Sequence, residues 1–403
     1  MEALNVISVI ALVLTMFYVV VISSFIRGWK ALKPFQYQQH QPLHVSIIIA
    51  ARDEAANIEK TIKDLLAQDY EKAFLEIIFI DDHSTDNTAE IIRTYEAQGI
   101  TLIQLKQSNT LNSYKKKAIE TAIGNARGEL IITTDADCRM GPNWLKTIVS
   151  YYQQGGYKMI SSPVVYFEEQ SRFERAQSLE FLFLIGMGAS TIGNNKPSTC
   201  NGANLAYERQ AFYEVGGFKG IDDLASGDDE LLLHKMAEKY CNKIGFLKNH
   251  DAIVYTQAKP TLREFIQQRK RWASKSTRYK NKSIIVLGIL VWLFNLSIVL
   301  NLLAGIILLL FGSAQAELLQ AMTNTMDTAK ISGGQQLLYL ALLQFCIKFL
   351  IEFLFLKKVT HFARRPKLMQ FLPLLNILHI IYLIYIGIAG NSGKYSWKGR
   401  MVR

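Results

Sequence analysis

Four long apolar stretches constrain this chain more than any other feature, because about 20 consecutive apolar residues are enough to cross a bilayer. The first stretch, Leu4 to Ile26, contains no charged residue. The other three lie in the C-terminal third of the chain, at roughly Ile284–Phe311, Leu337–Leu356 and Leu368–Ala389. One long polar region separates the first stretch from the rest. The sequence therefore predicts a folded domain attached to a membrane.

The charges that flank these stretches predict an orientation. Glu2 precedes the first stretch, and Arg27, Lys30 and Lys33 follow it, which is the reverse of a signal peptide. Basic flanks tend to stay in the cytoplasm. We therefore expect residues 1–30 to form an uncleaved anchor of a multi-pass protein in the cell inner membrane, with the polar region in the cytoplasm. A second basic loop lies between the last two stretches, with Lys357, Lys358, Arg364, Arg365 and Lys367.

The basic tail, residues 391–403, conflicts with a simple scheme of four crossings, one by the first stretch and three by the C-terminal segment 284–390. The tail carries Lys394, Lys398, Arg400 and Arg403, yet alternation would place it outside. Either the tail breaks the positive-inside tendency, or one C-terminal stretch is re-entrant or interfacial. The sequence leaves both alternatives open.

The net charge of +11 points to the membrane rather than to nucleic acid. Between Lys259 and Lys282 the chain has nine Lys or Arg residues and one acid, Glu264. Residues 258–283 are therefore expected to form an interfacial amphipathic segment that is attracted to anionic lipid headgroups. No nucleic-acid recognition motif accompanies the charge, so we expect no nucleic-acid partner. The four cysteines are scattered, which indicates a reducing compartment and no structural zinc.

Residues 43–257 alternate between β-rich runs and helical spacing, which is typical of an α/β domain. The predicted strands are Val45–Ala50, Leu75–Ile80, Thr101–Leu105 and Leu130–Thr134, and the predicted helices Glu54–Leu66, Ala89–Tyr95 and Lys116–Ile123. We expect an open, mostly parallel sheet with helices on both faces, which binds ligands at the carboxyl ends of its strands. No Gly-x-Gly-x-x-Gly or Walker motif is present in the sequence, which disfavours a dinucleotide dehydrogenase or a P-loop enzyme.

Acidic residues follow two of the predicted strands. Asp135 and Asp137 follow Leu130–Thr134, and their oxygens suit Mg²⁺ or Mn²⁺, which can bridge carboxylates to a diphosphate. A turn or capping pair is the structural alternative. Asp82 ends the second strand, where it could accept a hydrogen bond from the imide of uracil or cap the next helix.

Two later motifs supply further candidate groups. Gly227–Glu230 places carboxylates at a helix start, where Asp229, or alternatively Asp228, could remove a proton from an acceptor hydroxyl. Acids are also ordinary at that position. In Gln268–Trp272, Arg271 could neutralise a departing diphosphate, and Trp272 could stack under a sugar or anchor at the headgroups. A basic amphipathic helix on the membrane would have the same composition.

As an ordered set, these motifs resemble membrane-associated glycosyltransferase family 2, which includes cellulose, hyaluronan and poly-N-acetylglucosamine synthases and lipid glycosyltransferases. The matching stretches are Ser46–Asn57, Ile80–Thr88, Thr134–Asp137, Asn201–Asn204, Gly216–Phe218, Gly227–Glu230 and Gln268–Trp272. The resemblance implies a Rossmann-like GT-A fold, a divalent metal and a nucleotide-diphosphate sugar, usually UDP-linked, whose anomeric centre is inverted.

The resemblance also implies roles for individual residues. The positions that contact uridine correspond to Ala50, Arg52, Glu54 and Asp82, the metal motif to Asp135 and Asp137, the base to Asp229, and the motif over diphosphate and acceptor to Gln268, Arg271 and Trp272. Lys117 lies in a basic turn that often touches phosphate in the family. Two positions depart from the pattern: Glu120 stands where many members carry asparagine, and the base motif reads Gly-Asp-Asp rather than Thr-Glu-Asp or Gly-Glu-Asp.

These expectations describe an inverting glycosyltransferase that acts on a lipid or a polysaccharide acceptor at the cytoplasmic membrane face. A processive polysaccharide synthase, with a membrane partner subunit completing its channel, is one alternative. A catalytically silent nucleotide-sugar-binding membrane protein is another.

Overall fold

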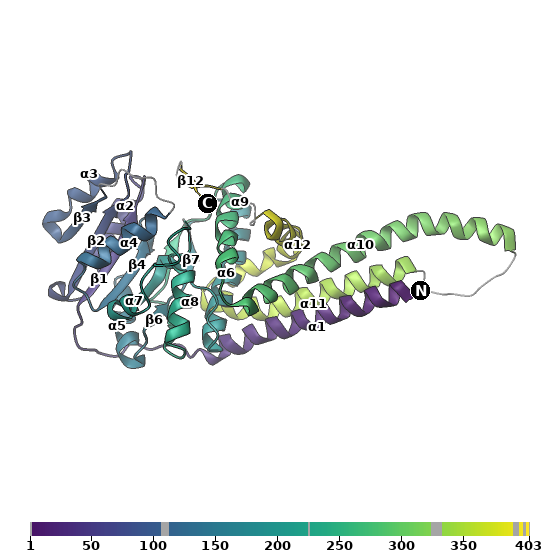
Figure 1. Ribbon diagram of the computed structural model, residues 1–403, viewed down its shortest axis with the longest axis horizontal. Coiled ribbons are helices and arrows are strands. Elements are labelled where there is room, and N and C mark those ends of the chain that lie inside the picture. Colours follow the sequence, from purple (N-terminus) through teal and green to yellow (C-terminus); the bar gives the residue numbers. More distant parts are fainter. Residues whose placement is uncertain are drawn as a thin grey trace.

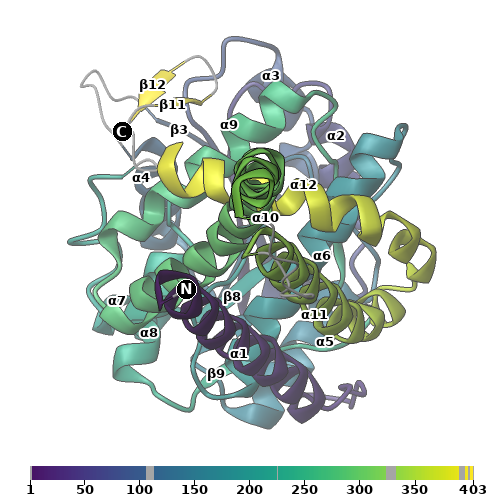
Figure 2. The same cartoon turned by 90° about the vertical axis from the view of Figure 1, so that its right-hand side faces the viewer.

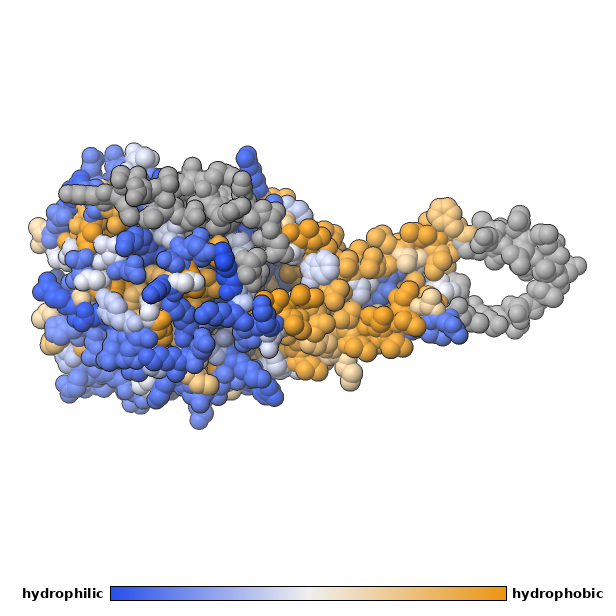
Figure 3. Space-filling model, viewed as in Figure 1, coloured by the Kyte–Doolittle hydropathy of each residue, from blue (hydrophilic) through white to orange (hydrophobic). Residues whose placement is uncertain are grey.

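The computed structural model describes residues 2–105, 113–224, 226–323, 333–389, 395–397 and 400–402. An α/β domain lies at one end of the molecule, and three long helices extend away from it (Figure 1). Figure 3 shows a polar surface on the domain and an apolar surface on the projecting helices. The division into a polar domain and membrane-type helices follows the distribution of charge along the chain.

The main sheet, within the described residues, has seven strands in the order β3–β2–β1–β4–β8–β6–β9. Strands β1, β2, β3 and β4 are parallel, which confirms the predicted fold class. Strand β8 is antiparallel to both of its neighbours. The strands are β1 (Val45–Ala51), β2 (Leu75–Asp81), β3 (Ile100–Gln104), β4 (Leu130–Asp135), β6 (Met159–Ser161), β8 (Leu205–Glu208) and β9 (Ile244–Phe246). A small second sheet contains β5 (Arg139–Met140), β7 (Val164–Tyr166) and β10 (Val254–Thr256).

Helices cover both faces of the main sheet because its central strand is apolar on both sides. Ile47 and Ile49 of β1 pack into one core, and Ile48 between them packs into the other. The helices of the domain are α2 (Ile58–Leu66), α3 (Thr88–Arg93), α4 (Tyr114–Asn125), α5 (Trp144–Gly155), α6 (Arg172–Gly193), α7 (Arg209–Glu214) and α8 (Glu230–Lys239). Helix α2 begins at Ile58 rather than at the expected Glu54, because residues 52–57 form the loop at the strand edge.

The register of the sheet aligns the strand ends that carry acidic residues. Ala51 pairs with Asp81 across β1 and β2, and Ala50 pairs with Asp135 across β1 and β4. The carboxyl ends of the parallel strands therefore meet at one edge, where ligands bind in sheets of this kind.

Three helices form the projecting bundle: α1 (Glu2–Ala31), α10 (Lys282–Thr323) and α11 (Gly333–Phe362). Buried hydrogen bonds connect them: Gln344 of α11 accepts from Asn301 of α10 at 2.9 Å and donates to Thr15 of α1 at 3.2 Å. Polar side chains in apolar surroundings bond to one another in this way. Helix α6 of the domain packs against α1 and α11, so the domain and the bundle share a core.

Helix α12 (Leu372–Ala389) has a different direction from the bundle. It is viewed nearly along its axis in Figure 1 and lengthwise in Figure 2, where it crosses α10. Among the described residues, four helices are long and apolar enough to cross a membrane, and α12 with the turn before it is the fourth. Its transverse direction is the one expected of an interfacial helix.

The tail after α12 returns to the domain. Strands β11 (Tyr395–Trp397) and β12 (Arg400–Val402) form a hairpin, and β11 lies beside α9 (Leu262–Ala273). Figure 1 places this hairpin at the domain end of the bundle. Of the basic tail residues, Lys394, Lys398 and Arg403 lie outside the described residues.

Candidate active site

A cavity of about 1530 Å³ lies at the carboxyl edge of the sheet and extends toward the bundle. Every predicted site residue except Lys117 lines it. The cavity brings together Ala50, Arg52, Glu54, Asp82, Asp135, Asp137, Asp228, Asp229, Gln268, Arg271 and Trp272. These residues come from three strand ends, the turn before α8 and helix α9, so the fold gathers motifs that are far apart in the sequence.

The cation of α4 that faces the cavity is Lys115, not the expected Lys117. Lys117 has a side chain that is 45% exposed and pairs with Glu120 at 3.5 Å. Lys115 Nζ instead lies 2.7 Å from Asp135 Oδ1 and 3.3 Å from Asp228 Oδ2. Lys116 is buried and donates to three backbone carbonyls of residues 221–226, which fixes the loop before α8. Lys115 therefore lines the cavity and Lys117 does not.

Asp135 and Asp137 form the candidate metal site. One ligand atom from each of them and the Cys138 sulfur lie within 4.8 Å of one another. Burial raises the pKa of the Cys138 thiol, and the nearby aspartates raise it further, so the sulfur stays neutral and is a poor ligand for a hard cation. Burial raises the pKa of Asp135, but the charge and hydrogen bond of Lys115 and the charge of Arg271 together outweigh it and leave that pKa lowered. The two carboxylates fit Mg²⁺ or Mn²⁺.

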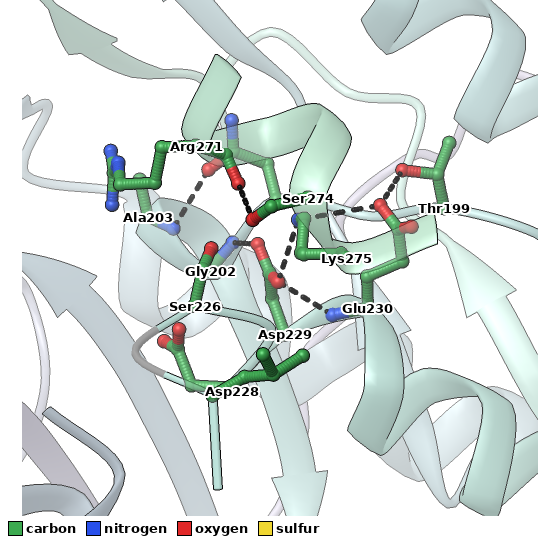
Figure 4. Close-up of polar contacts among 12 residues, drawn as sticks. Thr199, Gly202, Ala203, Ser226, Asp228, Asp229, Glu230, Arg271, Ser274 and Lys275 are labelled. Carbon is green, nitrogen blue, oxygen red and sulfur yellow. Dashed lines mark hydrogen bonds and ion pairs between the residues drawn. The ribbon is translucent and has the colours of Figure 1, made fainter. Parts of the chain in front are cut away.

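Asp229 lies across the cavity as the N-cap of α8 (Figure 4). Its Oδ1 accepts from the backbone N–H of Glu230 at 2.6 Å, and its Oδ2 accepts from the N–H of Gly202 at 3.2 Å. Lys275 Nζ lies 3.2 Å from Oδ1. Burial raises the pKa of Asp229, but the charges of Lys275 and Lys115 and the hydrogen bond from Glu230 together lower it more, to about 2. Asp229 is therefore ionised at neutral pH.

Two glycines allow the backbone to hold this carboxylate. Gly227 has φ +89°, a left-handed conformation that residues with a side chain rarely adopt. A Cβ at Gly202 would lie 3.3 Å from both Asp228 Oδ2 and Asp229 Cβ. The glycines before Asp228 and in the Asn201–Asn204 stretch thus have a steric reason to be glycine.

Sequence patterns did not identify Lys275 as a site residue, although they did single out its partner Asp229. Lys275 follows α9 in the turn Ser274–Arg278, is almost fully buried, and also lies 3.4 Å from Glu230 Oε2. Glu230 in turn accepts hydrogen bonds from Thr199 Oγ1 and from the Tyr279 hydroxyl. Burial lowers the pKa of Lys275, but Asp229 and Glu230 raise it above its ordinary value. In the sequence Lys275 is one of nine cations in a basic segment, and nothing distinguishes it from those that face lipid headgroups.

Helix α9 is attached to the domain through Arg269, which the sequence analysis also missed. Its guanidinium forms a buried ion pair with Glu180 of α6. The same group lies 4.2 Å from the ring centroid of Trp272 and donates to Gln268 Oε1 at 2.8 Å. Arg269 therefore sets the positions of Gln268 and Trp272, two of the three predicted residues of this motif. The third, Arg271, lowers the pKa of Asp135 by its charge.

Arg52 connects the ends of β1 and β2 at the other side of the cavity. Its Nη1 donates to the backbone oxygens of Asp82 at 2.8 Å and His83 at 3.2 Å. Asp53 and His83 both have positive φ, at 50° and 56°, so both strands turn sharply where they meet the cavity. Arg52, Glu54 and Asp82 consequently lie together, as the motif order predicts.

Comparison with known proteins identifies the central part of the chain. Residues 46–216 match the family described as Glycosyl transferase family 2. The chain carries a family 2 glycosyltransferase domain. The match ends before Asp228, so the assignment of the base and of the α9 motif depends on the geometry described above and not on this match.

Two curated relatives and one solved structure resemble the chain. Glycosyltransferase AglE of Haloferax volcanii is 30% identical over 46% of this chain and 58% of its own length. Beta-monoglucosyldiacylglycerol synthase of a Synechocystis species is 24% identical over 57% of this chain and 47% of its own. The chain thus spans about half the length of these relatives. The mannosyltransferase PcManGT from Pyrobaculum calidifontis has a TM-score of 0.56 at 20% identity and covers 84% of this chain and 98% of its own, which is a likeness of fold.

Proposed function

We propose that this protein transfers a sugar from a nucleotide-diphosphate sugar to an acceptor hydroxyl at a membrane surface. The observation that carries the proposal is the continuous cavity that joins Asp135 and Asp137 to Asp229 and to Arg271. A family 2 domain with this arrangement has the groups needed to bind a diphosphate, stabilise it as it leaves, and accept a proton. The adjoining apolar helices support a membrane location. The basic residues Arg27, Lys30 and Lys33 after the first of them favour a domain in the cytoplasm.

The donor is proposed to bind along the strand ends. Ala50, Arg52, Glu54 and Asp82 would contact the nucleoside, which the family pattern indicates is the uridine of a UDP-sugar. Asp135 and Asp137 would hold Mg²⁺ or Mn²⁺, which when bound offsets the negative charge of the diphosphate. PcManGT was solved in complex with GDP-Man and Mn²⁺, which supports a nucleotide sugar with a divalent metal but leaves the nucleoside to experiment.

The transfer is proposed as one in-line displacement. The acceptor oxygen attacks the anomeric carbon, the bond from that carbon to the diphosphate breaks, and the acceptor proton passes to Asp229. Gln268 and Trp272 would position the substrates, and Arg271 would stabilise the charge that builds on the diphosphate. One displacement inverts the anomeric configuration.

A transfer assay on the purified, membrane-reconstituted protein tests the proposal. It requires a panel of labelled UDP-sugars and GDP-mannose with Mn²⁺ or Mg²⁺. We expect Asp229→Asn to abolish transfer and to leave nucleotide binding nearly unchanged, because the amide keeps the shape of the side chain but cannot accept the proton. A chelator should also abolish transfer. Nucleotide binding without transfer in the unaltered protein would instead indicate a silent binding protein.

The acceptor is proposed to be a lipid or a polysaccharide. The relative named beta-monoglucosyldiacylglycerol synthase favours a lipid. A processive synthase, completed by a partner subunit, stays as the second candidate because the Gln-x-x-Arg-Trp motif of α9 also occurs in the synthases of the family. The size of the labelled product separates the two, since a lipid product gains one sugar and a polymer gains many.

A further inference from the structure

The cavity has a second, apolar branch that the proposed donor site does not use. Beyond Asp229 it continues between four helices, α1, α6, α10 and α12. Its walls there include Val21 and Phe25 of α1, Met187 of α6, Ile285 of α10, and Leu383 and Ile386 of α12. These six side chains are hydrocarbon or thioether, and polar side chains of the same helices, among them Tyr18, Trp292, His379 and Tyr382, also line the cavity. The cavity therefore joins a charged end in the domain to an apolar end in the bundle.

The size of the cavity leaves space for two substrates. Pockets that hold one small molecule or cofactor usually measure about 300–1,000 Å³. This one continuous cavity has a volume of about 1530 Å³, which exceeds that range. A nucleotide sugar at the strand ends would thus leave the apolar branch for the acceptor.

The apolar branch reaches the surface of the molecule where the exposed side chains are apolar. Ile289 of α10 and Ile388 of α12 line the cavity and are 51% and 65% exposed. Both lie on helices that are long and apolar enough to enter a membrane. Figure 3 shows the apolar surface beginning where the domain meets the bundle. The hydrocarbon chain of a lipid in the bilayer could therefore enter the cavity from the side without passing through water.

We propose that this branch holds the hydrocarbon chain of a lipid acceptor and presents the hydroxyl of that lipid to Asp229, a proposal that rests on the function proposed above. A polysaccharide would bring many hydroxyl groups into the branch. Each hydroxyl loses its water there and needs a replacement hydrogen bond. Phe25, Ile285 and Leu383 supply none and match a lipid chain. Of the polar side chains on the same helices, Tyr18, Glu180 and Trp292 already form hydrogen bonds within the protein. In the transfer, the lipid oxygen forms the bond to the anomeric carbon, its proton passes to the Asp229 carboxylate, and the diphosphate leaves with the bonding electrons.

Gly288 gives a direct test, because it lines the branch and a Cβ built on it meets nothing within 4 Å. Gly288→Trp should fill the branch without disturbing the helix backbone. Leu303→Trp is the matched control, since Leu303 lies on the same helix, is 51% exposed and does not line the cavity. Each protein is reconstituted into vesicles made from a total lipid extract of the cells that express it, and is supplied with the labelled donor.

We expect the unaltered protein and Leu303→Trp to give a labelled product that partitions into organic solvent. Gly288→Trp should lose about two orders of magnitude in transfer, as misplacement of a substrate on the order of 1 Å can cause. All three should bind the nucleotide equally, which shows that the variants are folded. Native mass spectrometry should detect a retained lipid in the first two proteins and less in Gly288→Trp.

Three outcomes would overturn the inference. Unchanged lipid transfer by Gly288→Trp would show that the branch does not hold the acceptor. A water-soluble polymer as the product would reject a lipid acceptor and leave the proposed glycosyl transfer intact. Donor binding without transfer to any acceptor in the unaltered protein would reject both proposals.

Discussion

At the scale of single residues, Lys275 controls the proposed base. It pairs with Asp229 and Glu230 in a buried position, and its charge is the main reason that the pKa of Asp229 falls to about 2 despite burial. A general base works best when its pKa is near the operating pH. The charge of Lys275 thus keeps Asp229 ionised. Because it lowers the pKa of Asp229, it also makes the carboxylate a weaker proton acceptor.

Removal of this charge should move the pH dependence of transfer. In Lys275→Met, burial of Asp229 is no longer opposed by that cation, so its pKa rises. Because the carboxylate must be ionised to accept a proton, the acidic limb of the kcat/KM profile should shift to higher pH. Lys275→Arg keeps a cation and should leave the limb close to its original position. An acidic limb that is the same in Lys275→Met would mean that Asp229 is not the titrating base.

Lys115 and Lys117 offer a second comparison between residues. Lys115 faces Asp135 and Asp228, whereas Lys117 is exposed. We expect Lys115→Met to lower kcat/KM by about 10²-fold, a cost comparable to removing one preorganised electrostatic group from an active site. Lys117→Met should have little effect. Equal losses in both variants, measured with the same donor, would show that the position of Lys115 beside Asp135 and Asp228 does not matter for transfer.

The sequence located this basic turn but could not tell which lysine faces the cavity. Consecutive residues of a helix point about 100° apart, at 3.6 residues per turn. The direction of each lysine therefore depends on how α4 packs on the sheet, through Ala118, Ile119 and Ala122. In contrast, Asp135 and Asp137 follow directly from the end of an apolar strand, and the structure places them in the cavity.

At the scale of elements, the buried pair of Arg269 and Glu180 joins α9 to α6. Their side chains are only 2% and 5% exposed, so removing one partner leaves an uncompensated buried charge. Arg269→Met should cost about 3–5 kcal/mol of stability. The Tm of the detergent-purified protein, compared with that of the unaltered chain, measures the loss.

The double variant Arg269→Met, Glu180→Met is the control for that prediction. Two apolar side chains leave no buried charge, so the double variant should recover much of the lost Tm. It should still transfer sugar poorly, because Gln268 and Trp272 lose the contacts that position them. If the double variant were less stable than Arg269→Met, the unpaired charge would not be the cause.

The elements that sequence patterns predicted are those with local signals. Strands β1, β2 and β4 are short, mostly apolar runs rich in isoleucine, which identify buried parallel strands. Strand β8 and helix α6 gave no such signal, because their burial comes from distant partners: β8 pairs with β4 and β6, and α6 packs on α1 and α11. The attachment of α9 depends on α6, so the sequence could not predict it either.

At the scale of the whole molecule, the direction of α12 determines which side the tail occupies. Helices α1, α10 and α11 extend together from the domain, whereas α12 runs across α10 and the tail hairpin lies beside α9 (Figures 1 and 2). The composition of α12 is that of a crossing helix, so hydropathy alone counts four spans. Only tertiary contacts distinguish a crossing helix from a transverse one.

We therefore predict that the tail and the catalytic domain lie on the same side of the membrane. With three crossings the basic tail is cytoplasmic, in agreement with the positive-inside tendency, whereas a fourth crossing would place it outside. Accessibility of a tag after Arg403 in intact cells, compared with tags before Glu2 and within the 324–332 segment, measures this directly. We expect labelling from outside at the last two sites and not at the first. Labelling of the tag after Arg403 from outside would show that α12 crosses the bilayer, and its transverse packing against α10 would then have to differ in the membrane.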